Sequence, residues 1–233
     1  MKFLFLALFV ISGAIHLYAS YNKNTKLRAR SKGFILPALL GWYICSVPAP
    51  SGIVIAALLT SWLGDVLLIP KGTKWFVAGG ISFMVSHACF VLAYLPQVDF
   101  GRIPLWAVLL TAAVYFTAVY FVFQGLKPYL KKALYYPMFL YLLINGTMNA
   151  FALFQLISMP CAATAIAYIG AVLFFISDST LFYVRFRKDT VLKKTYFIVK
   201  VSQIMLETHF IVMLTYIIAE FLIVQGLIMI AGM

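Results

Sequence analysis

Long apolar runs alternate with short polar clusters along the chain, and this pattern predicts a bundle of membrane-spanning helices. A helix needs roughly 17–25 apolar residues to cross a bilayer. We expect eight such helices, with proline, glycine and basic residues at the turns between them. Their approximate ranges are 3–20, 33–49, 52–69, 75–95, 103–125, 134–157, 161–184 and 198–223. The predicted fold class is all-α, a polytopic eight-helix bundle in which residues 1–233 form a single transmembrane domain.

Composition supports this interpretation and excludes several classes of protein. Hydrophobic residues make up 64% of the chain and charged residues only 10%, whereas a soluble domain carries roughly 25% charged residues. The net charge of +12 does not indicate nucleic-acid binding, because the basic residues form short clusters between apolar runs. The three cysteines lie in apolar stretches and give neither a disulfide framework nor metal-ligand spacing. We therefore expect no nucleic-acid partner, no metal and no cofactor.

The positions of lysine and arginine predict how the helices are oriented in the membrane. With eight spans, 16 of the 18 basic residues fall on one face, and Lys2 and Arg102 fall on the other. The positive-inside rule makes the rich face cytoplasmic and places both termini outside. Cleaving the first helix as a signal peptide would move a loop with five basic residues outside, so we expect that helix to be retained. The predicted location is the cell (inner) membrane.

Ionisable residues inside the apolar runs are the candidates for function. Asp178 interrupts the run from 161 to 184, and Asp65 ends a similar stretch. A carboxylate at membrane depth costs about 2.5–3.5 kcal/mol on insertion scales, so such a residue is a functional candidate by default. The pattern Gly-x3-Phe-x2-Ser precedes both Asp178 and His87. This echo is weak evidence for an internal repeat and a better indication of a polar site inside the bundle.

Asp65, Asp178 and His87 are the predicted catalytic residues. Two carboxylates in a medium of low dielectric do not both ionise readily, so one holds a proton and the pair can act as acid and base. Alternatively, each aspartate pairs with a basic or amide group and only fixes neighbouring helices. We favour catalysis, because asparagine or serine would fix helices at lower cost. His87 either bonds to a neighbouring helix or orients a carboxylate and transfers a proton.

Further polar residues extend this candidate site. Asn145 and Asn149 are one helical turn apart and can face the same cavity, either as substrate contacts or as interhelical hydrogen bonds. Arg185, at the mouth of the Asp178 helix, either sets the topology or receives a lipid phosphate. The predicted substrate-binding residues are Asn145, Asn149, Ser177, Glu207 and Arg185.

The positions of the polar residues along the predicted spans indicate where in the bundle this site lies. We expect Asp65, His87, Asn145 and Asp178 to line one cavity in the cytoplasmic half of the bundle. Glu220 falls towards the outer face of the expected eighth span. His16 and His209 are interpreted as structural.

Four of these motifs, in this order, resemble the YhhN-type lysoplasmalogenases over nearly the whole chain. They are Ser61-x2-Gly64-Asp65, Gly79-x3-Phe83-x3-His87, an asparagine on the sixth helix, and Gly170-x3-Phe174-x2-Ser177-Asp178. Lys32 is the nearest match to a lysine that the family carries near the start of its second helix. The resemblance continues with Thr215-Tyr216, whereas Glu220 stands where the family usually has glutamine.

The resemblance implies a hydrolase whose partner is a lysophospholipid in the bilayer. It implies cleavage of the vinyl-ether bond of a lysoplasmalogen into a fatty aldehyde and a glycerophospho-ethanolamine or -choline. Such hydrolysis needs a proton donor to the alkene carbon and a carboxylate that stabilises the resulting oxocarbenium ion. This division of labour parallels glycoside hydrolysis.

Three other classes remain open on the sequence. A small proton-coupled transporter also uses buried carboxylates, although the Gly/Pro breaks here fall at loops rather than mid-span. An intramembrane aspartyl protease would need glycine where Trp62 stands in its Gly-x-Gly-Asp motif. A lipid-binding or scaffold protein would not depend on the two aspartates for turnover.

Overall fold

Eight α-helices form a bundle in the computed structural model, which describes residues 1–187 and 197–233, with side chains for 1–186 and 209–233. Three single-turn 3-10 helices accompany them: η1 (Leu95–Gln97), η2 (Lys127–Tyr129) and η3 (Lys132–Leu134). The α-helices are α1 (Lys2–Tyr21), α2 (Thr25–Ser46), α3 (Gly52–Leu67), α4 (Thr73–Tyr94), α5 (Leu105–Leu126), α6 (Tyr135–Ser158), α7 (Ala162–Arg187) and α8 (Phe197–Ala231). The expected all-α class and the expected eight helices are thus both found.

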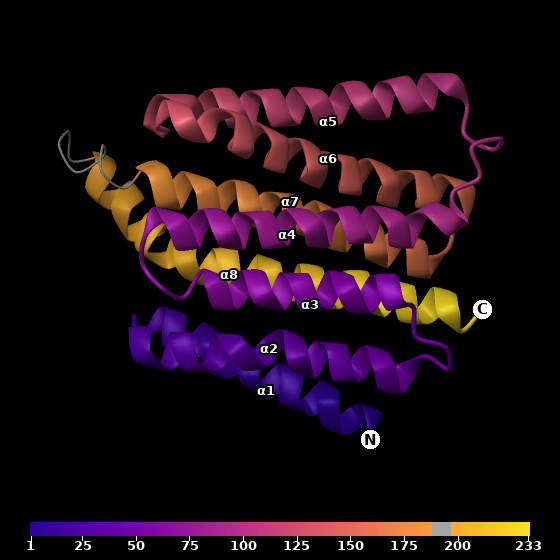
Figure 1. Cartoon of the computed structure of the whole chain (residues 1–233), viewed down its shortest axis with the longest axis horizontal. Coiled ribbons are helices and arrows are strands. Elements are labelled where there is room, and N and C mark those ends of the chain that lie inside the picture. Colours follow the sequence, from indigo (N-terminus) through magenta and orange to yellow (C-terminus); the bar gives the residue numbers. More distant parts are fainter. Residues whose placement is uncertain (188–196) are drawn as a thin grey trace.

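The helices run up and down along one common direction (Figure 1). Helices α1 and α2 form one edge of the bundle, α5 forms the opposite edge, and the other helices lie between them. Both termini lie at the same end. The connections α1–α2, α3–α4 and α5–α6 lie at the other end, which is also where α7 ends. The loops expected to carry most of the basic residues therefore share one end of the molecule.

Helix α2 begins earlier than the sequence pattern predicted. It starts at Thr25 rather than near residue 33, because the Asn24 side chain caps it by accepting a hydrogen bond from the Leu27 backbone N–H at 3.1 Å. Arg28 and Lys32, which were expected in a loop, therefore lie one turn apart on a helix. The same face of α2 presents both side chains to the interior.

Helix α8 also differs from its expected span. The predicted span was 198–223, whereas α8 runs from Phe197 to Ala231 and so continues beyond the expected end. Glu220, which was expected towards the outer face, is fully buried on this helix. Glu207 also lies on α8, and its side chain lies outside the described residues.

Small residues allow close helix contacts beside the two aspartates singled out from the sequence. A Cβ at Gly170 would lie 2.8 Å from the Ala219 carbonyl oxygen, so α7 and α8 touch backbone to backbone there. A Cβ at Gly64 would lie 2.6 Å from the Phe83 ring, which fills the space between α3 and α4. The glycines of the sequence motifs thus hold their helices at the distance at which the adjacent polar residues meet.

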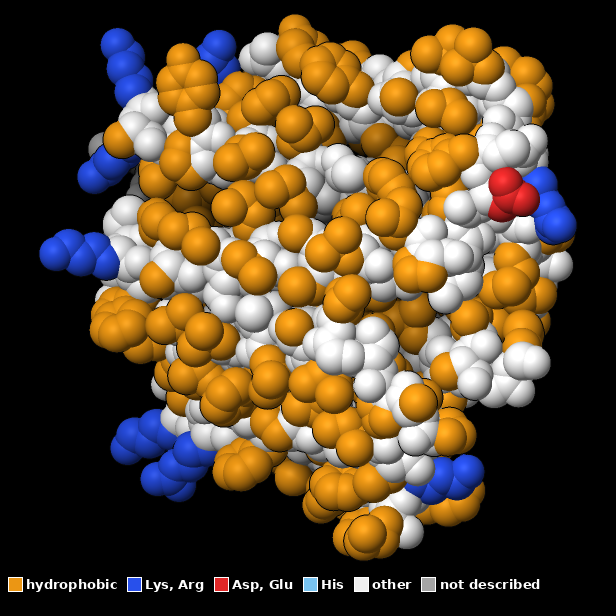
Figure 2. All heavy atoms as spheres, turned by 45° about the vertical axis from the view of Figure 1, so that its right-hand side comes forward, with side chains coloured by type: hydrophobic (Ala, Val, Ile, Leu, Met, Phe, Trp, Pro, Cys, Tyr) orange, Lys and Arg blue, Asp and Glu red, His pale blue; other side chains and the backbone are white. Residues whose placement is uncertain are grey.

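The surface of the bundle is that of a polytopic integral membrane protein. Six helical segments of the described chain are long and apolar enough to cross a membrane; the other two helices are α2, with four basic residues in its first turns, and α3, with 16 residues. Figure 2 shows hydrophobic side chains covering the visible face between the ends, with lysine and arginine side chains near the ends. Helix α5 contributes many apolar side chains to this surface, and Leu105, Trp106 and Phe121 are among those exposed on it.

Candidate functional site

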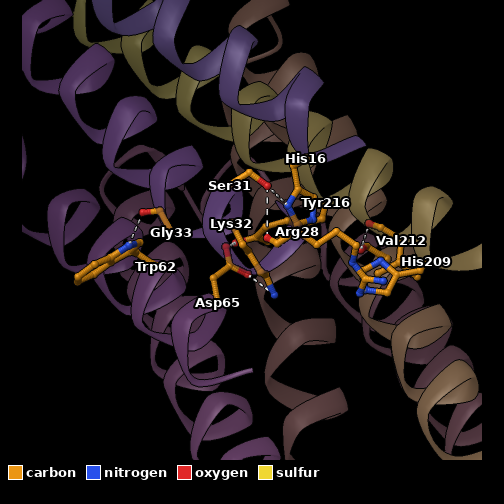
Figure 3. Close-up of polar contacts among 11 residues, drawn as sticks. His16, Arg28, Ser31, Lys32, Gly33, Trp62, Asp65, His209, Val212 and Tyr216 are labelled. Carbon is orange, nitrogen blue, oxygen red and sulfur yellow. Dashed lines mark hydrogen bonds and ion pairs between the residues drawn. The ribbon is translucent and has the colours of Figure 1, made fainter. Parts of the chain in front are cut away.

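Asp65 is held by two donors from different helices (Figure 3). The Lys32 Nζ lies 3.0 Å from Asp65 Oδ1, and the Tyr216 hydroxyl donates to Asp65 Oδ2 at 2.9 Å. Asp65 is almost completely buried on α3, and Lys32 reaches it from α2. Both oxygens of this carboxylate therefore have a partner, and one of the partners carries a positive charge that offsets its own.

Asp178 has partners of a different kind. The Tyr141 hydroxyl donates to Asp178 Oδ2 at 2.5 Å, and the Asn145 side-chain amide donates to the same oxygen at 2.9 Å. The His87 Nε2 lies 3.5 Å from that oxygen. All three contacts therefore converge on Oδ2, and no contact of the described residues with Oδ1 accompanies them. Unlike Asp65, Asp178 has no lysine or arginine against it within the described chain.

An aromatic cluster joins the two aspartate environments. The rings of Phe83, Phe174 and Tyr216 pack edge to face, with centroid distances of 5.4–6.4 Å. Tyr216 bonds to Asp65, while Phe174 also packs against His87, which faces Asp178. Phe83 and Phe174, the phenylalanines of the two repeated sequence motifs, thus pack between the two aspartate environments.

Both carboxylates line one cavity of about 440 Å³. Its wall comes from α1, α2, α3, α4, α7 and α8, and Pro70 and Lys71 of the α3–α4 loop stand at its mouth. The α3–α4 loop lies at the end of the bundle opposite the termini (Figure 1), so the cavity opens at that end. The other polar residues that line it are His16, Thr25, Arg28, Lys32, Ser177, Arg185, His209 and Tyr216.

Some predicted site residues lie behind this cavity rather than on its wall. His87, Asn145 and Asn149 were expected to face it, but they are fully buried and do not line it. The reason is that α6, which packs against α4 and α7, contributes no residue to the cavity wall, and α4 contributes only Phe76 and Phe83. The polar residues of these two helices therefore reach Asp178 from outside the cavity. The Asn149 amide donates to the Asn145 side-chain oxygen at 3.2 Å, which extends the support of Asp178 by one helical turn.

The remaining predicted substrate-binding residues have different positions. Ser177 lines the cavity, but its hydroxyl donates to the Val212 carbonyl at 2.9 Å and so ties α7 to α8. Arg185 lies at the cavity mouth, is exposed, and has its guanidinium 5.3 Å from the centre of the Phe76 ring. The side chain of Glu207 lies outside the described residues.

Several site residues were not assigned a role from the sequence. Tyr141 was not singled out from the sequence, and Tyr216 was named only as part of the family resemblance. Their contacts with Asp178 and Asp65 are what give them a place in the site. Arg28 contacts the His209 Nε2 across the gap between α2 and α8 (Figure 3). His16, interpreted as structural, bonds to the Ser31 hydroxyl at 2.9 Å and also lines the cavity.

Comparison with known proteins gives one match. The model of a protein family described as the YhhN family matches residues 27–227, which include every helix that contributes to the two aspartate environments. No curated protein and no solved structure matches the chain. Among residues 1–186 and 209–233, no group of three histidine, cysteine or acidic side chains is placed to share a metal ion.

Proposed function

Because the chain belongs to the YhhN family, we propose that it is a membrane-embedded hydrolase that cleaves the vinyl-ether bond of a lysoplasmalogen. The observation that carries this proposal is the pair of buried carboxylates with unlike partners on one cavity wall. Environments that differ in this way assign different proton states to two carboxyl groups. An acid and an ionised carboxylate are the two groups that vinyl-ether hydrolysis requires.

The contacts suggest which aspartate has which role. Asp65 faces the ammonium of Lys32 and is the carboxylate that stays ionised. Asp178 is held by neutral donors on Oδ2, so its proton sits on Oδ1. Asp178 is therefore the proton donor, and Asp65 stabilises the cation that protonation creates.

A balanced sequence of steps follows from these roles. Asp178 gives its proton to the outer alkene carbon, and the carbon attached to oxygen becomes an oxocarbenium ion beside Asp65. Water adds to that carbon while Asp65 takes one of its protons, which gives a hemiacetal. Asp178 then accepts the hemiacetal hydroxyl proton, the bond from that carbon to the glycerol oxygen breaks, and Asp65 protonates the departing oxygen. The products are a fatty aldehyde and a free hydroxyl group, and both aspartates return to their starting states.

The placement in the membrane is part of the proposal. All eight helices cross the bilayer, with the basic end of the bundle cytoplasmic and both termini outside. The 16 residues of α3 give a helix of about 24 Å, shorter than a typical hydrocarbon core of about 30 Å. Asp65 near the cytoplasmic end of α3 then lies within reach of the aqueous side through the cavity.

The experiment that tests this function compares three lipids of the same chain length. Purified protein is incubated with a lysoplasmalogen, its saturated ether analogue and the corresponding ester lysolipid, and aldehyde release is measured. We expect aldehyde from the vinyl ether alone, with slower turnover in heavy water because carbon is protonated in the slow step. Absence of aldehyde, combined with ion or lipid flux that depends on Asp65 and Asp178, would support the transporter alternative instead.

A further inference from the structure

The mouth of the cavity carries more positive charge than its two aspartates balance. Four basic side chains line the cavity, Arg28, Lys32, Lys71 and Arg185, against the two acidic ones. Lys32 is engaged by Asp65. Within the described residues, no carboxylate pairs with any of the other three basic side chains.

Arg28 is the best placed of these three for binding a ligand. It comes from α2 and contacts His209 of α8, so its guanidinium is fixed across the cavity and not extended into solvent (Figure 3). A guanidinium has five N–H donors in a planar fork that matches phosphate oxygens, and one contact with a histidine nitrogen leaves donors available. Thr25, on the first turn of the same helix, adds a hydroxyl and the positive end of the helix dipole.

Lys71 and Arg185 add two further basic side chains to the cavity lining. Lys71 lies in the α3–α4 loop and is exposed, and Arg185 lies on the last turns of α7 above the Phe76 ring. Together with Arg28, they bring positive charge to the cavity from three elements: α2, the α3–α4 loop and α7. We infer that Arg28, Lys71 and Arg185 form a phosphate-binding subsite that holds the headgroup phosphate of the lipid substrate. This inference rests on the proposed function, because the reacting bond must then lie deeper, between the aspartates.

The spacing along α2 suits such a ligand. Arg28 lies one turn nearer the mouth than Lys32, and one turn of an α-helix rises about 5.4 Å. A glycerol backbone separates a phosphate from a vinyl-ether oxygen by a comparable length. A phosphate bound to Arg28 thus places the vinyl ether at the level of Lys32 and of Asp65, which Lys32 contacts. The subsite predicts that substrate charge fixes the depth to which the lipid enters.

The test is a binding experiment with non-hydrolysable lipids. A saturated 1-O-alkylglycerol 3-phosphate and the matching 1-O-alkylglycerol are titrated into purified protein in detergent, and each affinity is measured calorimetrically. Wild type should bind the phosphate-bearing lipid about 10- to 100-fold more tightly, as expected for hydrogen bonds between charged groups. Arg28→Gln should bring this ratio close to one, and Arg28→Lys should leave an intermediate ratio, because it keeps the charge but loses the fork.

The control is Lys131→Gln, which removes an exposed lysine at the same end of the bundle but outside the cavity. It should keep the wild-type ratio. A wild-type ratio near one, or equal loss from Arg28→Gln and Lys131→Gln, would overturn the subsite. Inorganic phosphate should compete with the phosphate-bearing lipid and leave alkylglycerol binding unchanged. Competition without any preference for the phosphate-bearing lipid would assign the site to a free anion and overturn its role in lipid binding.

Failure of the phosphate subsite can be distinguished from failure of the proposed hydrolase activity. If the phosphate preference depends on Arg28 but no aldehyde is released from a vinyl ether, the subsite stands and the hydrolase proposal fails. If aldehyde is released but the two lipids bind equally, the hydrolase proposal stands and the subsite is wrong.

Discussion

His87 on α4 and Asp178 on α7 face each other, with the His87 Nε2 3.5 Å from Asp178 Oδ2. These residues end the same Gly-x3-Phe-x2-Ser pattern on two different helices. In each pattern the glycine lets its helix approach another neighbour, α3 for Gly79 and α8 for Gly170. The two phenylalanines pack against each other in the aromatic cluster, and the last residue of each pattern is polar and faces its counterpart.

Replacing either aspartate should abolish most of the activity. Asp65→Asn and Asp178→Asn should each lower kcat by about 10²–10⁴-fold, the range for removing general acid–base catalysis. The double variant should be little slower than the slower single variant, because the two groups act in one sequence of steps. Aldehyde release by purified variants is the measurement. Near-normal turnover in both single variants would show that the catalytic assignment is wrong.

The Lys32–Asp65 pair should behave as a buried ion pair in stability measurements. Lys32→Met leaves the Asp65 charge buried without its counter-ion, and losses of about 3–5 kcal/mol are typical of breaking such a pair. The double variant Lys32→Met/Asp65→Leu removes both charges and should recover most of the lost stability while remaining inactive. Unfolding in detergent, followed by circular dichroism, reports the stability. Equal stability of Lys32→Met and wild type would show that the pair contributes little.

Removing either hydrogen-bond donor to Asp178 should lower activity less than replacing Asp178 itself. Tyr141→Phe removes the donor at 2.5 Å from Oδ2, and Asn145→Ala removes the donor at 2.9 Å. Each should lower kcat with little change in KM, because neither side chain lines the cavity where the lipid binds. Tyr168→Phe, which removes a partly buried hydroxyl contact with Tyr115 away from the site, is the matched control and should retain activity.

The close contact of α7 with α8 predicts a strong effect of a single methyl group. Gly170→Ala places a Cβ 2.8 Å from backbone atoms of Ala219 and Ile223, which cannot rotate away. The overpacking should destabilise the protein by about 1–3 kcal/mol and reduce activity, because Asp178 and Tyr216 lie on these two helices. Gly33→Ala, whose Cβ meets nothing within 4 Å, should be tolerated. Thermal unfolding of the two variants is the comparison.

Orientation in the membrane can be checked by chemical labelling. In a background without native cysteines, Lys131→Cys lies at the basic end of the bundle, and Asp99→Cys lies near the other end. An impermeant thiol reagent should label Asp99→Cys in intact cells and label Lys131→Cys only after the membrane is permeabilised. The opposite result would reverse the proposed topology and place the cavity mouth on the outer side.

Much of the architecture was predictable because membrane helices show themselves as apolar runs. The eight helices were expected and are found. Asp65 and Asp178 were singled out because an acidic residue stands out against an apolar background, and both line one cavity. The start of α2 was wrong because hydropathy does not detect a helix whose first turns are basic; the Asn24 cap was the available signal. The end of α8 was also placed too early, at residue 223, although the helix continues to Ala231.

The partners of the two aspartates were less accessible to sequence reasoning. Tyrosine is common in apolar runs, and only the rotation of α6 and α8 decides that Tyr141 and Tyr216 point inward. The placement of Asn145 and Asn149 behind Asp178, rather than on the cavity wall, also depends on which side of α7 is covered by α6. Such choices are made by tertiary packing, which a single sequence does not encode locally.

The cavity opens at the end of the bundle opposite the termini, and under the proposed function this position limits which lipids the protein can reach. A protein inserted in a single orientation draws its substrate from one monolayer, so lipids of the other monolayer are consumed only as fast as they cross the bilayer. In vesicles with uniformly oriented protein, turnover should show a rapid phase that exhausts the accessible monolayer and then a slow phase set by transbilayer movement. Adding a lipid scramblase would merge the two phases. The geometry of the cavity thus makes bilayer asymmetry a determinant of substrate supply.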